Sequence, residues 1–303
     1  MAQKAIFRLI VGSALALPIA LGAEESFFKD RLPSIIKNIG NGFENSEGKV
    51  LYVWLDAPIG YISATKKYAQ NNIIGSLNIL ISCIDHGVKY FIFSSSAAVY
   101  GNPRYTPVDE LHPLEPSNYY GYTKLSIENS LKWFSEIHGL KYASLRYFNA
   151  AGYDINNRVV GKEKNTENLI PIIMQVAKGI KPFVPIYGNN YPTKDGTGVR
   201  DYVHVTDLAT AHLSSLDYLI RNSNNLILNL GSQNGFSVLE ILEKTKHILN
   251  IDIPYQIEER RKGDVAKIVS SCSLAEDILN WEKKYSALEI MIQSTWSIYN
   301  QKT

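Results

Sequence analysis

Tyr120 and Lys124 stand four residues apart, in a stretch that follows three consecutive serines, Ser94 to Ser96. If that stretch is helical, the spacing places both side chains on one helical face, one turn apart. A phenol with a pKa of about 10 is a poor base at neutral pH, but a nearby ammonium favours the phenolate and lowers that pKa. A serine hydroxyl beside the phenol could share the proton. These side chains therefore suit proton transfer to or from a substrate hydroxyl.

The elements around these residues predict how they are positioned. Residues 89–94 have the apolar and aromatic character of a buried strand that ends at the serines. Ser117 is a good N-cap for a helix that carries Tyr120 and Lys124 and runs towards His138, where Gly139 stops it. A Tyr–Lys pair alone is a weak signal, because about one such pair arises by chance in a chain with 19 tyrosines.

Helices and apolar strands alternate over the middle of the chain. A helix is expected from Asn72 to Ile84 and a strand from Tyr142 to Phe148, with Asn149 just beyond it. This alternation predicts an α/β fold with a doubly wound parallel sheet. Ligands bind at the carboxyl ends of the strands in such sheets, and Ser96 and Asn149 both fall at such ends.

Composition narrows the functional class. The chain has 303 residues, 45% of them hydrophobic and 20% charged, as in an ordinary globular protein. A formal net charge of +2 gives no electrostatic case for binding nucleic acid. Cys83 and Cys272 lie far apart in the sequence, which fits a reducing compartment, and no metal-binding constellation is visible.

The ordered combination KYFIFSSSAAVYG and PSNYYGYTK resembles the extended short-chain dehydrogenase/reductase family, and within it most closely the UDP-glucose 4-epimerases. The resemblance runs from about residue 68 to 300, and the run Tyr191–Val205 is its most family-specific piece. It implies interconversion of UDP-glucose and UDP-galactose through a 4-keto sugar, with NAD as cofactor and a homodimer as the assembly. It implies that Ser96, Tyr120 and Lys124 are the catalytic serine, tyrosine and lysine.

The resemblance also assigns ligand contacts. Beside Tyr120 and Lys124, the cofactor contacts that it implies are Asn72, Ser94, Ser95 and Tyr147. Beside Ser96, the substrate contacts that it implies are Phe148, Asn149, Asn168, Leu169, Pro185, Tyr187, Arg200, Arg261 and Asp264. Arg200 and Arg261 would clamp the diphosphate, because guanidinium forks match phosphate oxygens. Ile268 would stand beside the sugar, whereas His204, in an apolar strand, is expected to be a core histidine.

Two lobes are expected. Residues 69–165, rejoined by about 198–231, would form the Rossmann-like catalytic part, which is incomplete or altered at its N-terminal side. Residues 166–197 and 232–303 would form a smaller lobe that binds the nucleotide sugar, and residues 1–68 an atypical N-terminal segment.

One family feature is missing. Members begin with a strand and a GxxGxxG turn, which brings backbone to the NAD pyrophosphate, and no such turn occurs in the 303 residues. Tight NAD binding should then be lost, so a nucleotide-sugar binder without a competent cofactor site is the alternative. A nucleotide-sugar dehydratase would need an Asp–Glu pair after the strand serine, where this chain has Ala97 and Ala98.

The first 68 residues raise two further hypotheses. Residues 1–23 have the layout of a secretory signal peptide, with a buried N-terminal helix as the alternative; a cytoplasmic enzyme away from membranes is expected unless they act as signal or anchor. Residues 48–69 resemble a methionyl-tRNA synthetase segment, but HIGH and KMSKS motifs are absent, so no aminoacylation is expected.

Overall fold

The computed structural model describes residues 49–53, 69–162, 166–261 and 263–301. The predictions for residues 1–23, and most of the segment 48–69, lie outside this part of the chain. The described residues belong to two compact units. Of the described residues, unit 1 comprises 49–53, 69–96, 119–145 and 212–227, and unit 2 comprises those in the ranges 97–118, 146–211 and 228–301.

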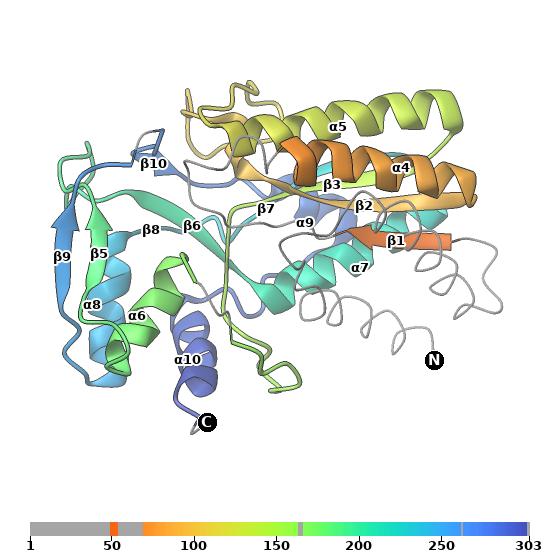
Figure 1. Ribbon diagram of the computed structural model, residues 1–303. Helices are drawn as coiled ribbons and strands as arrows, with labels where there is room; N and C mark the ends of the chain where they lie inside the picture. The colour runs from red at the N-terminus through yellow and green to blue at the C-terminus, as the bar shows by residue number, and fades with distance from the viewer. Residues whose placement is uncertain (1–48, 54–68, 163–165, 262, 302–303) are drawn as a thin grey trace. The chain divides into compact units, whose positions relative to one another are not determined.

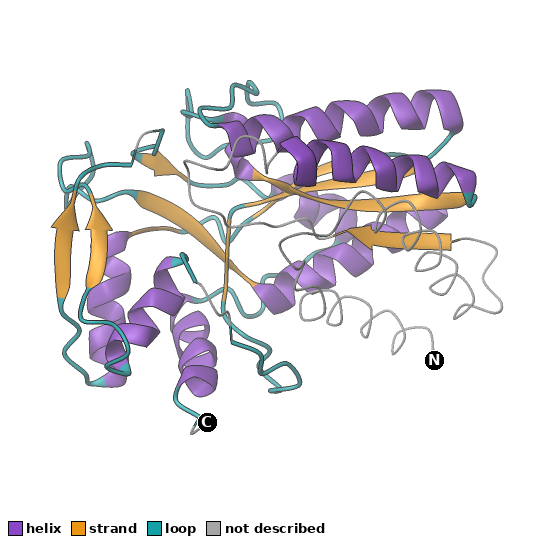
Figure 2. Ribbon diagram, in the orientation of Figure 1, coloured by secondary structure: helices purple, strands orange, loops and turns teal. Residues whose placement is uncertain are grey.

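Unit 1 is built on a parallel sheet with the strand order β1-β2-β3-β7, whose last two strands continue into unit 2 (Figures 1 and 2). The four strands are β1 (Lys49–Val53), β2 (Val88–Ser96), β3 (Lys141–Tyr147) and β7 (Leu226–Leu230). β1 pairs with β2 in parallel, from Lys49 opposite Val88 to Val53 opposite Phe93. A strand from the atypical N-terminal segment thus covers the edge of β2, which would otherwise present unpaired backbone groups.

Two helices of unit 1 pack on β2 and on each other. They are α4 (Gly75–Asp85) and α5 (Tyr119–His138), and α4 is preceded by a turn of π-helix, η2 (Ala69–Ile74). Their apolar faces meet β2 in a core that includes Leu80, Leu131 and Phe91, each at most 1% exposed. α5 begins two residues after the predicted N-cap, Ser117, whose hydroxyl donates to the Gly263 carbonyl. The helix expected from Asn72 to Ile84 is π-helical at its start.

Unit 2 holds a second sheet in the order β10-β6-β4, with β8 antiparallel to β6, and a two-stranded sheet of β5 and β9. These strands are β4 (Asn149–Ala151), β5 (Val184–Tyr187), β6 (Val199–His204), β8 (Gly235–Ser237), β9 (Tyr255–Glu258) and β10 (Lys267–Ile268). Its helices are η3 (Ala97–Tyr100), α6 (Leu169–Ala177), α8 (Val238–Leu249), α9 (Ser273–Leu279) and α10 (Leu288–Tyr299). α7 (Val205–Asn222) starts in unit 2 and ends in unit 1.

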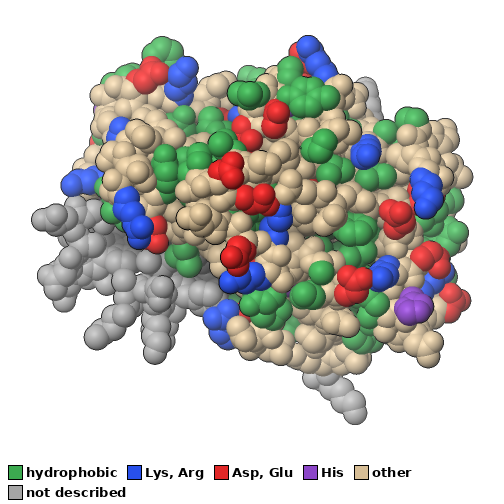
Figure 3. Space-filling view, turned by 180° about the vertical axis from the view of Figure 1, so that it is seen from behind, with side chains coloured by type: hydrophobic (Ala, Val, Ile, Leu, Met, Phe, Trp, Pro, Cys, Tyr) green, Lys and Arg blue, Asp and Glu red, His purple; other side chains and the backbone are tan. Residues whose placement is uncertain are grey.

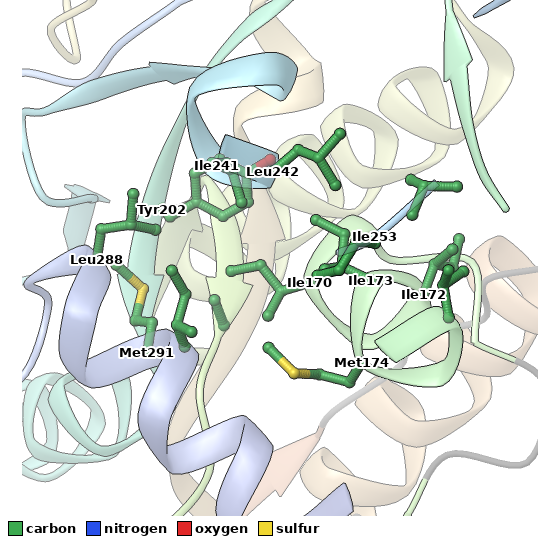
Figure 4. Packing of buried hydrophobic residues seen from close by; sticks show 14 of the residues in the cluster. Ile170, Ile172, Ile173, Met174, Tyr202, Ile241, Leu242, Ile253, Leu288 and Met291 are labelled. Carbon is green, nitrogen blue, oxygen red and sulfur yellow. The ribbon is translucent and has the colours of Figure 1, made fainter. Parts of the chain in front are cut away.

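The core of unit 2 lies among α6, α8, α10 and β6 (Figure 4). Ile173 and Met174 on α6, Ile241 on α8 and Met291 on α10 are all fully buried there. Tyr202 of β6 points into the same cluster, and strand alternation places it on the same face of the strand as Arg200, two positions before it. This packing fixes β6, the strand that carries Arg200.

Charge on one face of the molecule and the length of the described helices bear on the kinds of partner that were considered. On the face drawn in Figure 3, acidic and basic side chains are interspersed and neither sign forms a continuous patch. Among the described residues, no helix combines the length and the apolar character that crossing a bilayer requires. The same part of the chain holds no cluster of His, Cys, Asp and Glu that could bind a metal ion.

Candidate active site

Lys124 ties the start of α5 to the end of β2. Its side chain is fully buried, and Nζ donates a hydrogen bond of 2.9 Å to the Ser94 carbonyl. Nζ lies 5.4 Å from the centre of the Tyr120 ring and 5.3 Å from that of Phe93. A buried ammonium beside a half-exposed phenol, at the carboxyl end of a parallel strand, is an arrangement that can stabilise a phenolate. Ser96 ends β2 in the same unit, so unit 1 contains all three predicted catalytic residues.

A second contact holds the same helix to the same strand one turn further on. Glu128 is 5% exposed, and it accepts a hydrogen bond of 2.5 Å from the Ser95 hydroxyl. Because Glu128 follows Lys124 by four residues, both side chains reach β2 from one face of α5. The sequence reasoning did not single out Glu128; its signal is the i,i+4 spacing from the catalytic lysine.

Asn72, a predicted cofactor contact, is held by a residue that sequence reasoning also missed. Asn72 is 1% exposed, and its side-chain nitrogen donates to the Thr123 hydroxyl at 3.0 Å. The Thr123 hydroxyl in turn donates to the Tyr120 carbonyl at 2.8 Å. One buried hydroxyl therefore connects η2 with the turn of α5 that carries the phenol.

The end of β2 is also buttressed from α7. His212, which is 6% exposed, lies with Nε2 at 3.4 Å from the Ser94 hydroxyl. Ser94 and Ser95 are both buried, at 2% and 0% exposure. Two of the predicted cofactor contacts are thus fixed by partners on helices, which leaves Ser96, partly exposed, as the serine nearest to solvent.

In unit 2 the predicted substrate residues form two pairs. The Arg261 guanidinium lies over the Tyr187 ring, 3.8 Å from its centre. Arg200 and Asp264 form an ion pair with Nη2 and Oδ1 3.8 Å apart. The pairs bring together groups that can stack on a base, bind phosphate oxygens and accept from a ribose hydroxyl. Tyr187 was predicted to flank a uracil, and one face of its ring is covered by Arg261.

The remaining predicted contacts of unit 2 lie at the ends of strands and helices. Phe148 is buried and donates its backbone N–H to the Leu230 carbonyl at 3.2 Å, whereas Asn149 is exposed. Asn168 is the N-cap residue of α6 and Leu169 its first residue. Pro185 lies on β5, and Ile268 on β10 stands opposite Arg200 in the sheet.

A buried network lies behind Tyr147, which belongs to unit 2 and not to the unit that holds the other cofactor contacts. Arg146 donates to the Tyr100 hydroxyl at 3.1 Å, and that hydroxyl donates to the Asn229 side-chain oxygen at 2.6 Å. Burial raises the pKa of Tyr100 to about 12, so this phenol stays neutral and acts as a donor. The network fixes the end of β3, where Tyr147 is the last residue and Phe148 and Asn149 follow.

His204 is a core histidine, as predicted. It is fully buried; its Nδ1 accepts from the Thr206 N–H at 3.0 Å, and Nε2 lies 3.2 Å from the Ser294 hydroxyl. The Nδ1 contact requires the tautomer with the proton on Nε2. Burial lowers the pKa of His204 to about 4, so the ring is neutral at physiological pH.

The chain matches known proteins over most of its length. A family model described as GDP-mannose 4,6 dehydratase matches residues 61–294. The UDP-glucose 4-epimerase of Halalkalibacterium halodurans is 43% identical over 235 residues, which cover 78% of this chain and 70% of that protein. The chain belongs to the UDP-glucose 4-epimerase family.

Other members extend the likeness to structure. The UDP-glucose 4-epimerase of Lacticaseibacillus casei is 41% identical over 76% of this chain and 70% of its own length. The crystal structure of the Bifidobacterium longum enzyme in complex with NAD+ and UDP has a TM-score of 0.81 at 32% identity, over 90% of this chain and 81% of that chain. The Brucella ovis enzyme in complex with NAD has a TM-score of 0.80. The predicted α/β fold with a parallel, Rossmann-like sheet is confirmed.

The N-terminal part matches a different family. A model described as tRNA synthetases class I (M) matches residues 26–75, in agreement with the resemblance of residues 48–69. Most of this match lies outside the described residues; within it, β1, η2 and the first residue of α4 are described. The epimerase family model begins at residue 61, so the two matches overlap around η2.

Proposed function

We propose that this chain interconverts UDP-glucose and UDP-galactose by inverting the configuration at C4 of the sugar. The proposal rests on the buried side chain of Lys124. Its Nζ donates to the Ser94 carbonyl and lies 5.4 Å from the centre of the Tyr120 ring. It gives a phenol that is held next to a fixed positive charge at the end of a strand. Such a group is suited to remove a proton from a sugar hydroxyl and to return it.

The side chains have separate roles in this proposal. Tyr120 takes the proton of the 4-hydroxyl and later returns it, Lys124 stabilises the phenolate, and Ser96 shares the proton. Arg200 and Arg261 bind the diphosphate with charge-assisted hydrogen bonds. Arg200 lies beside Asp264, which can accept from a ribose hydroxyl, and Arg261 lies over Tyr187, which can stack on a base. The uridine end is bound by groups of unit 2.

NAD is the cofactor that this proposal requires, and the residues of unit 1 fit its nicotinamide end. Asn72, Lys124 and Ser95 offer buried polar groups of fixed orientation beside β2, the chemistry that a ribose and a carboxamide need. When bound, NAD supplies the acceptor and donor of hydride for C4, which amino-acid side chains lack. The pyrophosphate end has no GxxGxxG turn to bind it anywhere in the sequence.

The missing turn favours a second candidate, a nucleotide-sugar binder that cannot hold NAD tightly. It keeps Arg200, Arg261 and Asp264 and therefore binds UDP. Dehydratase chemistry is disfavoured, because Ala97 and Ala98 follow the strand serine where an acidic pair would be needed.

One pair of measurements separates the two candidates. The full chain is incubated with UDP-galactose and added NAD, and UDP-glucose is measured; calorimetry with UDP and with NAD runs in parallel. Conversion supports the epimerase. UDP binding without NAD binding and without conversion supports the binder. No binding of UDP at all would overturn both.

A homodimer is part of the proposal, through α5 and its neighbour α4. Both helices belong to unit 1 and pack on each other; Trp133 and Ile137 on α5 and Ile81 on α4 are large apolar side chains that are exposed. Exposed apolar groups gathered on adjacent helices are typical of a surface that another subunit covers.

A further inference from the structure

Asp201 is a fully buried carboxylate in the middle of β6. It accepts five hydrogen bonds. Oδ1 accepts from the backbone and the hydroxyl of Ser232, both at 2.7 Å, while Oδ2 accepts from the Gln233 N–H at 3.1 Å and from the backbone and hydroxyl of Ser270 at 3.0 and 2.5 Å. These five donors satisfy both oxygens of a buried carboxyl group.

The donors come from two segments that flank β6. Ser232 and Gln233 follow β7, and Ser270 follows β10, which pairs with β6 at Lys267 opposite Val199 and Ile268 opposite Arg200. The segment that ends at Ser270 is the one that carries Arg261 and Asp264. Asp201 therefore ties the strand of one proposed phosphate ligand to the segment of another.

The residues around the Asp201 carboxylate are closely packed. A Cβ at Gly231 would lie 2.6 Å from Oδ2 of Asp201 and would also overlap the Ser270 hydroxyl, so only glycine fits there. The Cys272 thiol donates to the Ser270 hydroxyl at 3.1 Å, and burial raises the pKa of Cys272 to about 12, which keeps it a neutral donor. The carboxylate thus has one available position, and the two segments are fixed with it.

Strand alternation gives this anchor its consequence. Arg200 precedes Asp201, so its side chain leaves the opposite face of β6, where it is partly exposed and pairs with Asp264. We infer that Asp201 is a positioning residue for the diphosphate of the nucleotide sugar: it holds Arg200 and Asp264 in register from behind the strand. The inference rests on the proposed function of these two residues as UDP ligands.

Replacement of Asp201 by asparagine tests the inference. Asn has the same shape but only one acceptor oxygen, and its NH2 group would face donors. We expect Asp201→Asn to weaken UDP binding about tenfold in calorimetry, because hydrogen bonds to a charged acceptor are lost and the register loosens. In an Arg200→Ala background the same change should cost less than about twofold, since it acts through Arg200.

Asp207→Asn is the matched control. Asp207 is also a buried carboxylate of unit 2, 1% exposed, and accepts from the Ser286 hydroxyl at 2.6 Å and the Tyr285 N–H at 2.9 Å, but neither donor belongs to the segment with Arg261 and Asp264. It should lower the melting temperature and leave UDP affinity within about twofold. Equal losses of affinity in the two variants would overturn the inference.

Two milder variants decide the matter if Asp201→Asn does not fold. Ser270→Ala and Ser232→Ala each remove one hydroxyl donor to Asp201. Ser270→Ala should weaken UDP binding more, because Ser270 belongs to the segment of Asp264. Equal affinities would overturn the inference. A wild-type chain that binds no UDP would overturn the proposed function itself, which the wild-type titration reveals before any variant is measured.

Discussion

Tyr120 differs from its neighbour Tyr119 in what its ring meets. The Tyr120 ring has the Lys124 ammonium 5.4 Å from its centre, whereas the Tyr119 ring stacks on Tyr122, with ring centres 5.7 Å apart. Both are tyrosines of the first turn of α5, so they form a matched pair for separating catalysis from folding. The difference predicts opposite outcomes for the same substitution.

We expect Tyr120→Phe to lower the turnover of UDP-galactose by about 10²–10⁴-fold, the range for loss of a general acid–base group. UDP affinity should stay within about twofold, because the hydroxyl does not hold the nucleotide. Tyr119→Phe should retain wild-type turnover. Initial rates and calorimetry on the three proteins measure both quantities. A Tyr120→Phe protein with wild-type turnover would contradict the assignment of Tyr120 as the proton-transfer residue.

His204 links the stability of the protein to acid. Its pKa is lowered from 6.5 to about 4 in the folded state, mainly by burial, with Asp154 opposing. As pH falls from 6.5 to 4, His204 binds a proton in the unfolded chain but stays neutral in the folded chain. This histidine therefore removes about 1.4 kcal/mol of unfolding free energy for each pH unit in that window. Above pH 6.5 both states are neutral at this position and the effect is absent.

The measurement is the melting temperature between pH 7 and 4. His204→Gln should give a shallower decline than the wild type between pH 6.5 and 4, whatever its stability at pH 7. His138→Gln, at an exposed position near the end of α5, is the control for replacing a histidine. Parallel curves for the wild type and His204→Gln would show that folding does not lower the pKa of His204.

At the scale of elements, α8 begins with a capping box. The Ser237 hydroxyl accepts from the Glu240 N–H at 3.0 Å, and the Glu240 carboxylate accepts from the Ser237 N–H at 2.8 Å. The same hydroxyl donates to Asp195, which ties the family-specific run Tyr191–Val205 to the helix. Two backbone donors at the end of α8 are thereby satisfied.

Ser237→Ala should lower the free energy of unfolding by about 1–2 kcal/mol, the loss of an N-cap plus a hydrogen bond to a carboxylate. Urea denaturation at equal slope measures the change. Ser130→Ala is the control, since its hydroxyl only returns to the Ser126 carbonyl within α5 and alanine suits a helix interior. A loss no larger than that of the control would mean that Asp195 and Glu240 find other partners.

Elements that follow from periodicity alone could be predicted from the sequence. The strand expected at 142–148 is Lys141–Tyr147, and the strand expected at 89–94 lies within Val88–Ser96. Two details were not predicted: the Ser117 hydroxyl donates to the distant Gly263 carbonyl and α5 begins two residues later, and the helix expected from Asn72 starts as the π-helix η2. The local sequence holds no record of these partners.

The candidate site divides in the same way. Tyr120 and Lys124 could be found because they lie on one helix at a telling spacing. Thr123 and Asp201 could not, because each acts through a residue that is distant in sequence, Asn72 and Ser270 respectively. Glu128 was missed, although its spacing of four from Lys124 is a signal, because its partner Ser95 is distant in sequence. The carboxylate of Asp201, next to Arg200 in β6, indicates a positioning role only once its hydrogen-bond donors are known.

For the whole molecule, the proposed functions divide between the two units. The predicted catalytic residues and Asn72, Ser94 and Ser95 belong to unit 1, and the predicted nucleotide ligands belong to unit 2. Chain segments pass between the units several times, and β3, β7 and α7 each have residues in both. The proposed activity therefore needs residues of both units. β1, which pairs with β2, comes from the segment that matches another family.

The assembly of the chain is testable on the exposed face of its catalytic helix. Trp133 and Ile137 on α5 are 62% and 68% exposed, and Ile81 on the adjacent α4 is 51% exposed. Burial of these side chains by a second copy favours association by about 25 cal/mol per Å² of apolar surface. The wild type should sediment as a dimer at micromolar concentration, and Trp133→Glu should raise the dimer dissociation constant at least about tenfold, because a charge would have to be buried.

Leu111→Glu is the control: Leu111 is 90% exposed but lies on neither helix, so this variant should stay dimeric. A Trp133→Glu protein that dimerises like the wild type would place the subunit contact elsewhere, and a wild type that is monomeric throughout would remove the dimer from the proposal.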